Sequence, residues 1–268
     1  MNVPLRRVGL SMLAGALLSP LHGDPRAPTR PAARRTEPLL ISPADRTLVQ
    51  RGFVPFRGLK RCYACVVGSP SGIHFAYDCE TGAVLYLWRG AFADVAEMWA
   101  GRAFNQTAVP AGEDLVEFSG RPLLALFPDR LLEYPSTWPE RPDPLFSSLG
   151  YEIDPDGSVV FLASLSELHL RDRIAARADQ RGLSRTLEFS GKLSLWENWV
   201  LLADAERITA EGNKFKISPA GCSIEWPAGS PHRPVVVDTH GRQQLRLRLL
   251  KETFKTPVTY QIVWSATP

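Results

Sequence analysis

The sequence has little excess charge of either sign. Of its 268 residues, 31 are Lys or Arg and 28 are Asp or Glu, so the formal net charge is only +3. Arg6 and Arg7 lie in a segment that we expect to be removed, which leaves 29 basic against 28 acidic residues, a net charge of +1. A nearly neutral chain has no electrostatic attraction for nucleic acid or for an anionic membrane surface. We therefore expect neither class of partner.

Several catalytic and cofactor signatures are also missing. The sequence has no GxSxG nucleophile elbow, no P-loop and no GxGxxG fingerprint. Its histidines, at positions 22, 74, 169, 232 and 240, show neither the HxH nor the HExxH spacing that would gather metal ligands on one strand or helix. The sequence therefore predicts no cofactor and no metal site.

The first 23 residues have the pattern of a cleavable export signal. Arg6 and Arg7 precede an apolar run over residues 8–18, and small and turn-forming residues follow it. This run is about half as long as the roughly 20 apolar residues that a membrane span needs. We expect a periplasmic or secreted protein with no membrane span after signal cleavage. Residues 24–38 contain four prolines and four arginines, which predicts an extended, disordered tether.

The chain has only four cysteines, and an even number in an exported protein favours disulfides. Residues 61–67 and 73–79 have the pattern of two hairpin strands around a Gly- and Pro-containing turn. If position 68 faces position 73, paired residue numbers sum to 141, and Cys62 lies opposite Cys79. Elimination then pairs Cys65 with Cys222. A register shift of one residue would remove this pairing, so the three connectivities remain open.

Short strands and turns dominate the rest of the chain, and we find no βαβ alternation. Residues 61–88 predict a three-stranded meander, and the helical spacing of apolar residues in 91–100 predicts a short helix. Beyond residue 150, alternation is clear in the last strand, where Val258, Tyr260, Ile262 and Trp264 share one face. The fold class that follows is all-β and mainly antiparallel. We expect a β-sandwich or supersandwich-like fold with a short helix and the N-terminal tether.

A proline-rich stretch over residues 132–148 divides this pattern in two. We place an N-terminal β-meander part at residues 39–140 and a C-terminal antiparallel sandwich part at residues 149–268. One continuous fold that contains both parts is the alternative.

The densest group of chemically useful side chains lies between residues 73 and 102. Trp88 and Trp99 are candidate platforms for a small polar ligand such as a sugar, and Arg89, Asp94 and Arg102 are candidate polar groups that hold it. The alternative is that the tryptophans belong to the core and the charged residues to turns.

A catalytic alternative rests on three side chains of the same segment. His74, Asp78 and Asp94 are the acid and base candidates of a carbohydrate-active enzyme. This interpretation requires that at least two of them converge in one pocket with a perturbed pKa.

One long segment carries a family resemblance. It reads HFAYDCETGAVLYLWRGAFADVAEMWAGR, and GYEIDPDGSVVF and GLSRTLEFSG follow it. The most specific positions are Trp88, Gly90, Phe92, Asp94, Trp99, Gly101 and Arg102. Residues 48–190 resemble a family of uncharacterised exported bacterial β-rich domains, often associated with c-type cytochromes and sugar-active enzymes. At residues 103–105 the chain departs from the glycine-rich continuation of that family. The resemblance implies an exported location and a β-rich fold, and it brings no established activity.

The leading functional hypothesis is an exported binding or accessory module without catalysis of its own. Its expected partner is a carbohydrate or an extracytoplasmic protein, such as a redox partner. The alternatives are a carbohydrate-active enzyme with a mutarotase-like or lyase-like sandwich fold, and a structural envelope protein.

Overall fold

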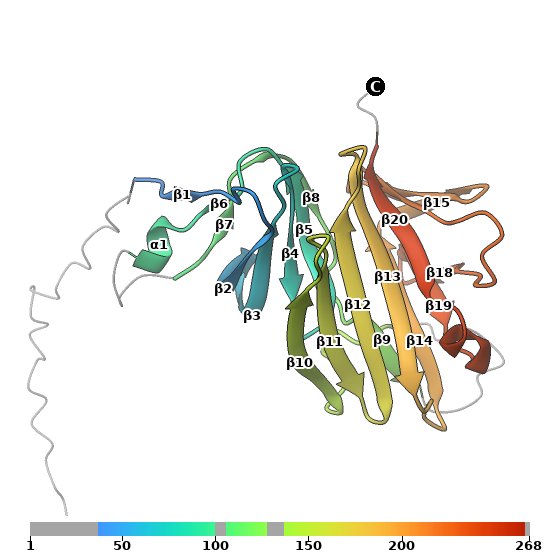
Figure 1. Cartoon of the computed structure of the whole chain (residues 1–268). Coiled ribbons are helices and arrows are strands. Elements are labelled where there is room, and N and C mark those ends of the chain that lie inside the picture. The colour runs from blue at the N-terminus through green and yellow to red at the C-terminus, as the bar shows by residue number, and fades with distance from the viewer. Residues whose placement is uncertain (1–36, 100–105, 128–136, 266–268) are drawn as a thin grey trace, which may run out of the picture. The chain divides into compact units, whose positions relative to one another are not determined.

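The described part of the chain consists almost entirely of β-strands, as its alternating residues predict. The computed structural model describes residues 37–99, 106–127 and 137–265. Within these ranges every ladder between two strands is antiparallel, which confirms the all-β, sandwich-like fold class (Figure 1). No helix in these ranges is long and apolar enough to cross a lipid bilayer. The predicted signal peptide at residues 1–23 and most of the predicted tether at residues 24–38 lie outside the described residues.

The predicted meander forms the centre of a five-stranded sheet with the order β2-β3-β4-β5-β8. Gly72 and Gly82 permit its tight turns, because both adopt a positive φ, of 79° and 68°, that side chains disfavour. The strands are β2 (Leu48–Phe56), β3 (Leu59–Gly68), β4 (Ile73–Asp78), β5 (Ala83–Arg89) and β8 (Glu113–Glu117).

Both faces of β4 are covered, and all six of its residues are buried. Phe75 and Tyr77 belong to the main core, whereas Ala76 belongs to a second core on the opposite face. This double burial explains why the strand lacks the clean alternation of a sheet with one wet face. It also places His74, the neighbour of Phe75, on the side of the second core.

A small three-stranded sheet covers that second core. Its strands are β1 (Leu40–Ile41), β6 (Ala93–Asp94) and β7 (Val109–Pro110), in the order β1-β6-β7. The helix that we expected over residues 91–100 is a single turn, α1 (Ala96–Trp99). The apolar spacing in this segment arises because Phe92, Ala93 and Val95 pack into the second core.

Two further sheets contain the strands from β9 onward. The eight-stranded sheet has the order β10-β11-β12-β13-β20-β17-β16-β15, and the four-stranded sheet has the order β18-β19-β14-β9. The first contains β10 (Phe146–Ile153), β11 (Val159–Leu165), β12 (Leu168–Ala176), β13 (Gly182–Gly191), β20 (Val258–Trp264), β17 (Cys222–Glu225), β16 (Lys214–Ser218) and β15 (Arg207–Glu211). The second contains β18 (Val235–Thr239), β19 (Arg242–Arg248), β14 (Glu197–Ala205) and β9 (Leu124–Phe127), and a short 3-10 helix, η1 (Lys251–Phe254), precedes β20.

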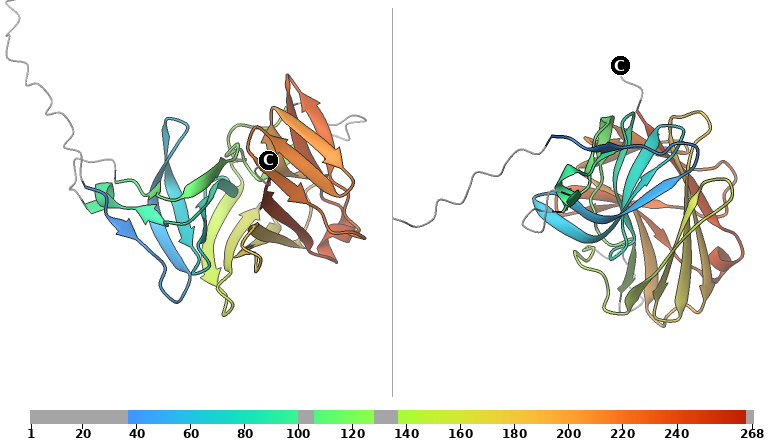
Figure 2. Two further views of the ribbon diagram at one scale, coloured as in Figure 1. Left: turned by 90° about the horizontal axis from the view of Figure 1, so that it is seen from above. Right: turned by 60° about the vertical axis from the view of Figure 1, so that its left-hand side comes forward.

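One hydrophobic core includes residues of both predicted parts of the chain. Tyr77 of the five-stranded sheet stacks on Phe161 of the eight-stranded sheet, with ring centroids 3.7 Å apart and planes 6° apart. Figure 2 shows the blue and cyan strands of the first sheet beside the yellow-green strands of the second. The described residues accordingly belong to one compact unit.

The register of the first hairpin differs by one residue from the expected register. Gly68 pairs with His74 rather than with Ile73, so the paired numbers sum to 142. The Ser69 amide donates to the Ile73 carbonyl at 3.3 Å, so Ser69 rather than Gly68 faces Ile73, the first residue of β4. Cys62 therefore does not face Cys79, and the expected disulfide between them is not formed.

All four cysteines are free thiols in this structure. The two that lie close together are not the two that we expected. The sulfur atoms of Cys65 and Cys79 lie 3.7 Å apart. Cys222, the expected partner of Cys65, is buried on β17. The expected pairs Cys62–Cys79 and Cys65–Cys222 are both corrected by this arrangement.

Candidate functional site

The structure brings His74 and Trp88 together, but in the second core rather than on the surface. Their ring centroids are 5.7 Å apart, and the His74 ring lies 5.1 Å from that of Phe92. Trp88 is 0% exposed, and its Nε1 donates to the Phe92 carbonyl at 2.8 Å. The expected role of Trp88 as a ligand platform is therefore corrected: it is a core residue.

Burial of His74 gives the first prediction, a loss of stability in mild acid. Burial lowers the pKa of this imidazole, although Nε2 lies 2.9 Å from the Gly90 carbonyl. Below the ordinary histidine pKa of about 6.5, His74 is protonated in the unfolded chain but still neutral in the folded chain. The free energy of unfolding therefore falls as pH falls. Urea unfolding at about pH 7.5 and about pH 5.5 measures this loss on either side of the ordinary histidine pKa.

A phenylalanine at position 74 keeps an aromatic ring in the same place and cannot titrate. We expect His74→Phe to lose less stability than the wild type between the two pH values. His169→Phe is the matched control, because His169 is exposed on β12. If His74→Phe and the wild type lose the same stability between the two pH values, titratable groups other than His74 cause the loss.

The two candidate carboxylates have structural partners. Asp78 accepts a hydrogen bond from the Glu80 amide at 2.9 Å and lies 3.3 Å from the Arg61 guanidinium. Burial raises the pKa of Asp78. Asp94 accepts the amides of Leu39 and Ala96, both at 2.9 Å, so it fixes β1 and the start of α1.

These acid and base candidates do not converge. His74 and Asp78 stand at opposite ends of β4, four residues or about 13 Å apart along the strand. Asp94 lies on a different sheet. In the described part of the chain, none of the four main cavities is lined by any of these three groups, so the catalytic alternative gains no support from them.

Two of the expected ligand residues are exposed, and they belong to different elements. Trp99 is the last residue of α1 and is 76% exposed. Arg102 lies outside the described residues. Arg89, the last residue of β5, is the one expected ligand residue that lines an open cleft together with other polar and aromatic side chains.

The cleft joins the edge of the five-stranded sheet to the end of β20. The Arg89 guanidinium forms an ion pair with Asp114 and lies 5.9 Å from the ring centroid of Trp264. The indole Nε1 of Trp264 donates to the Asp114 carbonyl at 2.8 Å, across a separation of 150 residues. The cleft has a volume of about 600 Å³. That volume is within the range of about 300–1,000 Å³ of small-ligand sites.

A second arginine enters the cleft from the turn between β12 and β13. The Arg181 amide donates to Asp179 at 3.1 Å, which fixes this turn, and the Asp179 carboxylate also binds Arg177. Among the described residues that line the cleft, Asp114 is the only acidic one, against Arg89 and Arg181. The cleft therefore has an excess of positive charge beside an indole ring.

Neither models of protein families nor curated proteins match this sequence. The family resemblance therefore stays a prediction. What the cleft can bind follows from its own side chains: two guanidinium groups for an anion, and an indole ring for an apolar surface.

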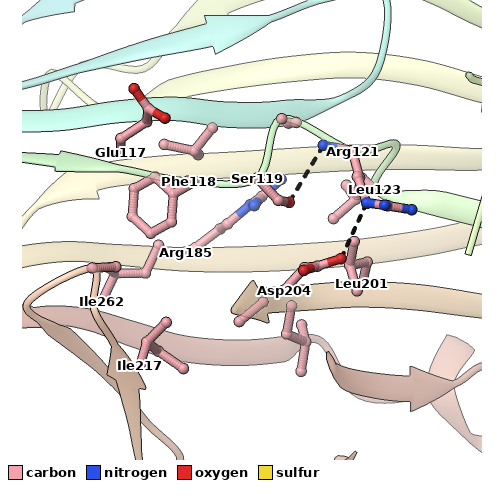
Figure 3. A pocket seen from close by; sticks show the side chains of 16 residues that line it. Glu117, Phe118, Ser119, Arg121, Leu123, Arg185, Leu201, Asp204, Ile217 and Ile262 are labelled. Atoms are coloured by element: carbon pink, nitrogen blue, oxygen red, sulfur yellow. Dashed lines mark hydrogen bonds and ion pairs between the residues drawn. The ribbon is translucent and has the colours of Figure 1, made fainter. Parts of the chain in front are cut away.

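Figure 3 shows a second cavity, which is too small for such a ligand. Its volume is about 40 Å³. Arg121 reaches Asp204 there, with Nε 3.1 Å from the carboxylate (Figure 3). Arg242 and Gln244 also donate to Asp204, each at 2.6 Å. These bonds satisfy a buried carboxylate, so the cavity is part of the packing between strands.

Sequence reasoning found Arg89 but missed Arg181, Asp114 and Trp264 as its neighbours. Arg181 lies in a recognisable turn, residues 179–182, but a turn gives no sign of what it faces. Alternation placed Trp264 on the buried face of the last strand. No local signal shows that the end of this strand lies beside Arg89 and Asp114, where the Trp264 ring reaches a cleft.

Proposed function

We propose that this protein is an exported binding module that holds an anionic carbohydrate in the cleft of Arg89, Arg181 and Trp264. The observation that carries the proposal is the presence of two arginines and an indole ring in one open cleft. Sugar rings present apolar faces that pack on indole, and a carboxylate or sulfate on the sugar pairs with guanidinium groups. The expected export signal would bring the protein to the periplasm or the cell exterior, where such polymers occur.

Arg89 is already ordered for this role. Its ion pair with Asp114 and its position over Trp264 restrict the side chain before any ligand arrives. A guanidinium that is held in place loses less conformational entropy on binding than a free one. Asp114 also holds the indole through its carbonyl, so one residue positions both groups.

The second prediction is a loss of affinity for acidic glycans when either arginine loses its charge. Titration calorimetry of the full chain with polygalacturonate, alginate and neutral dextran measures the binding. We expect saturable binding of at least one acidic polymer and none of dextran. Arg89→Gln and Arg181→Gln should each weaken it about tenfold or more, because a hydrogen bond to a charged group contributes about 1.5–3 kcal/mol.

Arg171→Gln is the matched control, because Arg171 is an exposed β12 arginine whose ion pair with Glu152 lies outside the cleft. Its affinity should equal that of the wild type. Added salt should weaken binding, since the contacts are ionic and partly exposed. Equal losses in all three variants would indicate non-specific charge attraction. No binding of any acidic polymer would overturn the proposal and favour the structural interpretation.

A further inference from the structure

Three of the four cysteines line one pocket, at the opposite end of β4 from His74. The pocket has a volume of about 760 Å³ and is lined by Cys62, Cys65 and Cys79, with Arg51 and Tyr151 among its other residues. This pocket shares no lining residue with the cleft of Arg89 and Trp264.

An irregularity in β3 explains how two cysteines three residues apart reach the same pocket. On a regular strand, Cys62 and Cys65 would point to opposite faces. Between the pairs Gly52–Ala64 and Val54–Arg61, β3 has two residues where β2 has one. Such a bulge interrupts the alternation of side chains between the two faces of the sheet, so a side chain beyond it points to the other face. It therefore permits Cys62 to line the pocket from the same side as Cys65.

The register places Cys65 and Cys79 diagonally on one face. Cys65 pairs with Tyr77, and Cys79 follows Tyr77 by two residues. The Cys79 amide donates to the Tyr63 carbonyl at 2.8 Å, which continues the ladder beyond β4 and fixes the position of Cys79. The two sulfur atoms are 3.7 Å apart, against about 2.05 Å in a disulfide. A small movement is enough to join them.

The two thiols differ in reactivity. The hydrogen bond with Cys65 lowers the pKa of Cys79, and the charge of Arg51 acts in the same direction. The same hydrogen bond and burial raise the pKa of Cys65. Cys65 is buried, whereas Cys79 is only partly buried. Of these two thiols, Cys79 is therefore the one that attacks an external disulfide first, because thiolate fraction and access determine the rate of exchange.

We propose that Cys65 and Cys79 form a dithiol that exchanges reversibly with external disulfides through this pocket. The Cys79 thiolate attacks one sulfur of the external disulfide, whose S–S bond breaks and releases the first thiolate. Cys65 then gives its proton to solvent, and its sulfur attacks the Cys79 sulfur and releases the second thiolate. The pair loses two electrons, and the external disulfide becomes two thiols, which take up the protons.

The third prediction is tested with oxidised glutathione as the external disulfide. The reduced full chain is equilibrated in glutathione buffers of graded ratio, and the thiols are alkylated before and after reduction with two reagents of different mass. We expect Cys65 and Cys79 to be protected together, to appear cross-linked in a peptide map, and to be reduced again by glutathione. This measurement needs no variant.

Variants separate the two steps. Cys65→Ser should accumulate a mixed disulfide between Cys79 and glutathione, because the resolving thiol is missing. Cys79→Ser should abolish the cross-link, while Cys62→Ser and Cys222→Ser should leave it unchanged. Near-ultraviolet circular dichroism shows whether each variant is folded.

Two results would overturn the proposal. One is that Cys65 and Cys79 stay accessible to the first reagent while glutathione modifies Cys62. The other is a Cys65–Cys79 bond that glutathione never reduces, which would make it a permanent structural crosslink. Neither result changes the expected binding of acidic glycans.

Discussion

Replacing Asp172 by asparagine is expected to lower the free energy of unfolding by about 3–5 kcal/mol, because it leaves a buried arginine without its counter-charge. Arg185 donates to both oxygens of Asp172, from Nε at 2.9 Å and from a terminal nitrogen at 2.6 Å. The side chain of Asp172 is 0% exposed and that of Arg185 is 5% exposed. Urea unfolding of the two proteins measures the difference.

This ion pair also joins the two large sheets. Tyr77 of β4 donates its hydroxyl to Asp172 at 2.9 Å, and Arg185 donates to the Gly82 carbonyl at 3.0 Å. Burial, together with the charge of Asp172, raises the pKa of Tyr77, so its hydroxyl stays protonated and able to donate. An asparagine at position 172 keeps the shape of the side chain and removes the charge. The loss therefore combines the missing counter-charge with hydrogen bonds that the amide nitrogen of asparagine cannot accept.

Arg171→Gln serves as the control, on the same strand but in exposed ion pairs with Glu152 and Glu188. Exposed pairs contribute about 0–1 kcal/mol, so this variant should remain close to the wild type. The double variant Asp172→Leu/Arg185→Met should be more stable than Asp172→Asn, because no unpaired charge remains. A loss below about 1 kcal/mol in Asp172→Asn would mean that water or another group compensates Arg185.

The strands were predictable wherever one face is buried and the other is not. In β12 the buried and exposed residues alternate, from Leu168 and His169 onward, and the sequence alternates with them. β4 shows the limit of this signal: its six residues are buried because a core lies on each face. Apolar residues on both faces predict a strand but not which residues meet which core. That assignment decides whether His74 is a site residue or a core residue.

The strand register of the first hairpin could not be predicted from the sequence, for a physical reason. The last ladder pair of the hairpin, Gly68 with His74, encloses one residue more than expected, and β3 has a bulge opposite Phe53. Neither feature has a distinct residue pattern, and each shifts the partners of every later residue. The expected pair Cys62–Cys79 therefore became the observed neighbours Cys65 and Cys79. The hairpin itself was predicted correctly, while the sulfur chemistry built on its register was not.

The candidate cleft depends on a contact that no local pattern encodes. Trp264 meets Asp114 across 150 residues, through one indole hydrogen bond. The sequence identified Arg89 as chemically interesting, because it stands beside Trp88 in a dense cluster. The structure separates these two neighbours, because adjacent strand residues point to opposite faces. Trp88 enters the second core and Arg89 turns to the cleft.

Trp88→Ala is expected to destabilise the protein by about 3–5 kcal/mol, the cost of removing a large, fully buried aromatic side chain. The indole is 0% exposed and stacks near Phe92, with planes 6° apart and centroids 6.3 Å apart. Its Nε1 donates to the carbonyls of Ala91 and Phe92, and alanine leaves both without that donor. The loss therefore combines a cavity with unsatisfied carbonyls. Thermal unfolding should shift by roughly 6–20 °C for a chain of this size.

Trp99→Ala gives the matched comparison, since it removes the same side chain from an exposed position in the same segment. Trp99 is 76% exposed, so its loss should change stability by no more than about 0.5 kcal/mol. If Trp88→Ala were as mild as Trp99→Ala, the three-stranded sheet would not cover Trp88 as the structure shows. If only Trp88→Ala loses much stability, any weaker ligand binding by this variant would be a result of its unfolding and not of a lost contact with the ligand. Trp88 is therefore unsuitable as a binding probe, and Arg89 and Arg181 are the residues to vary.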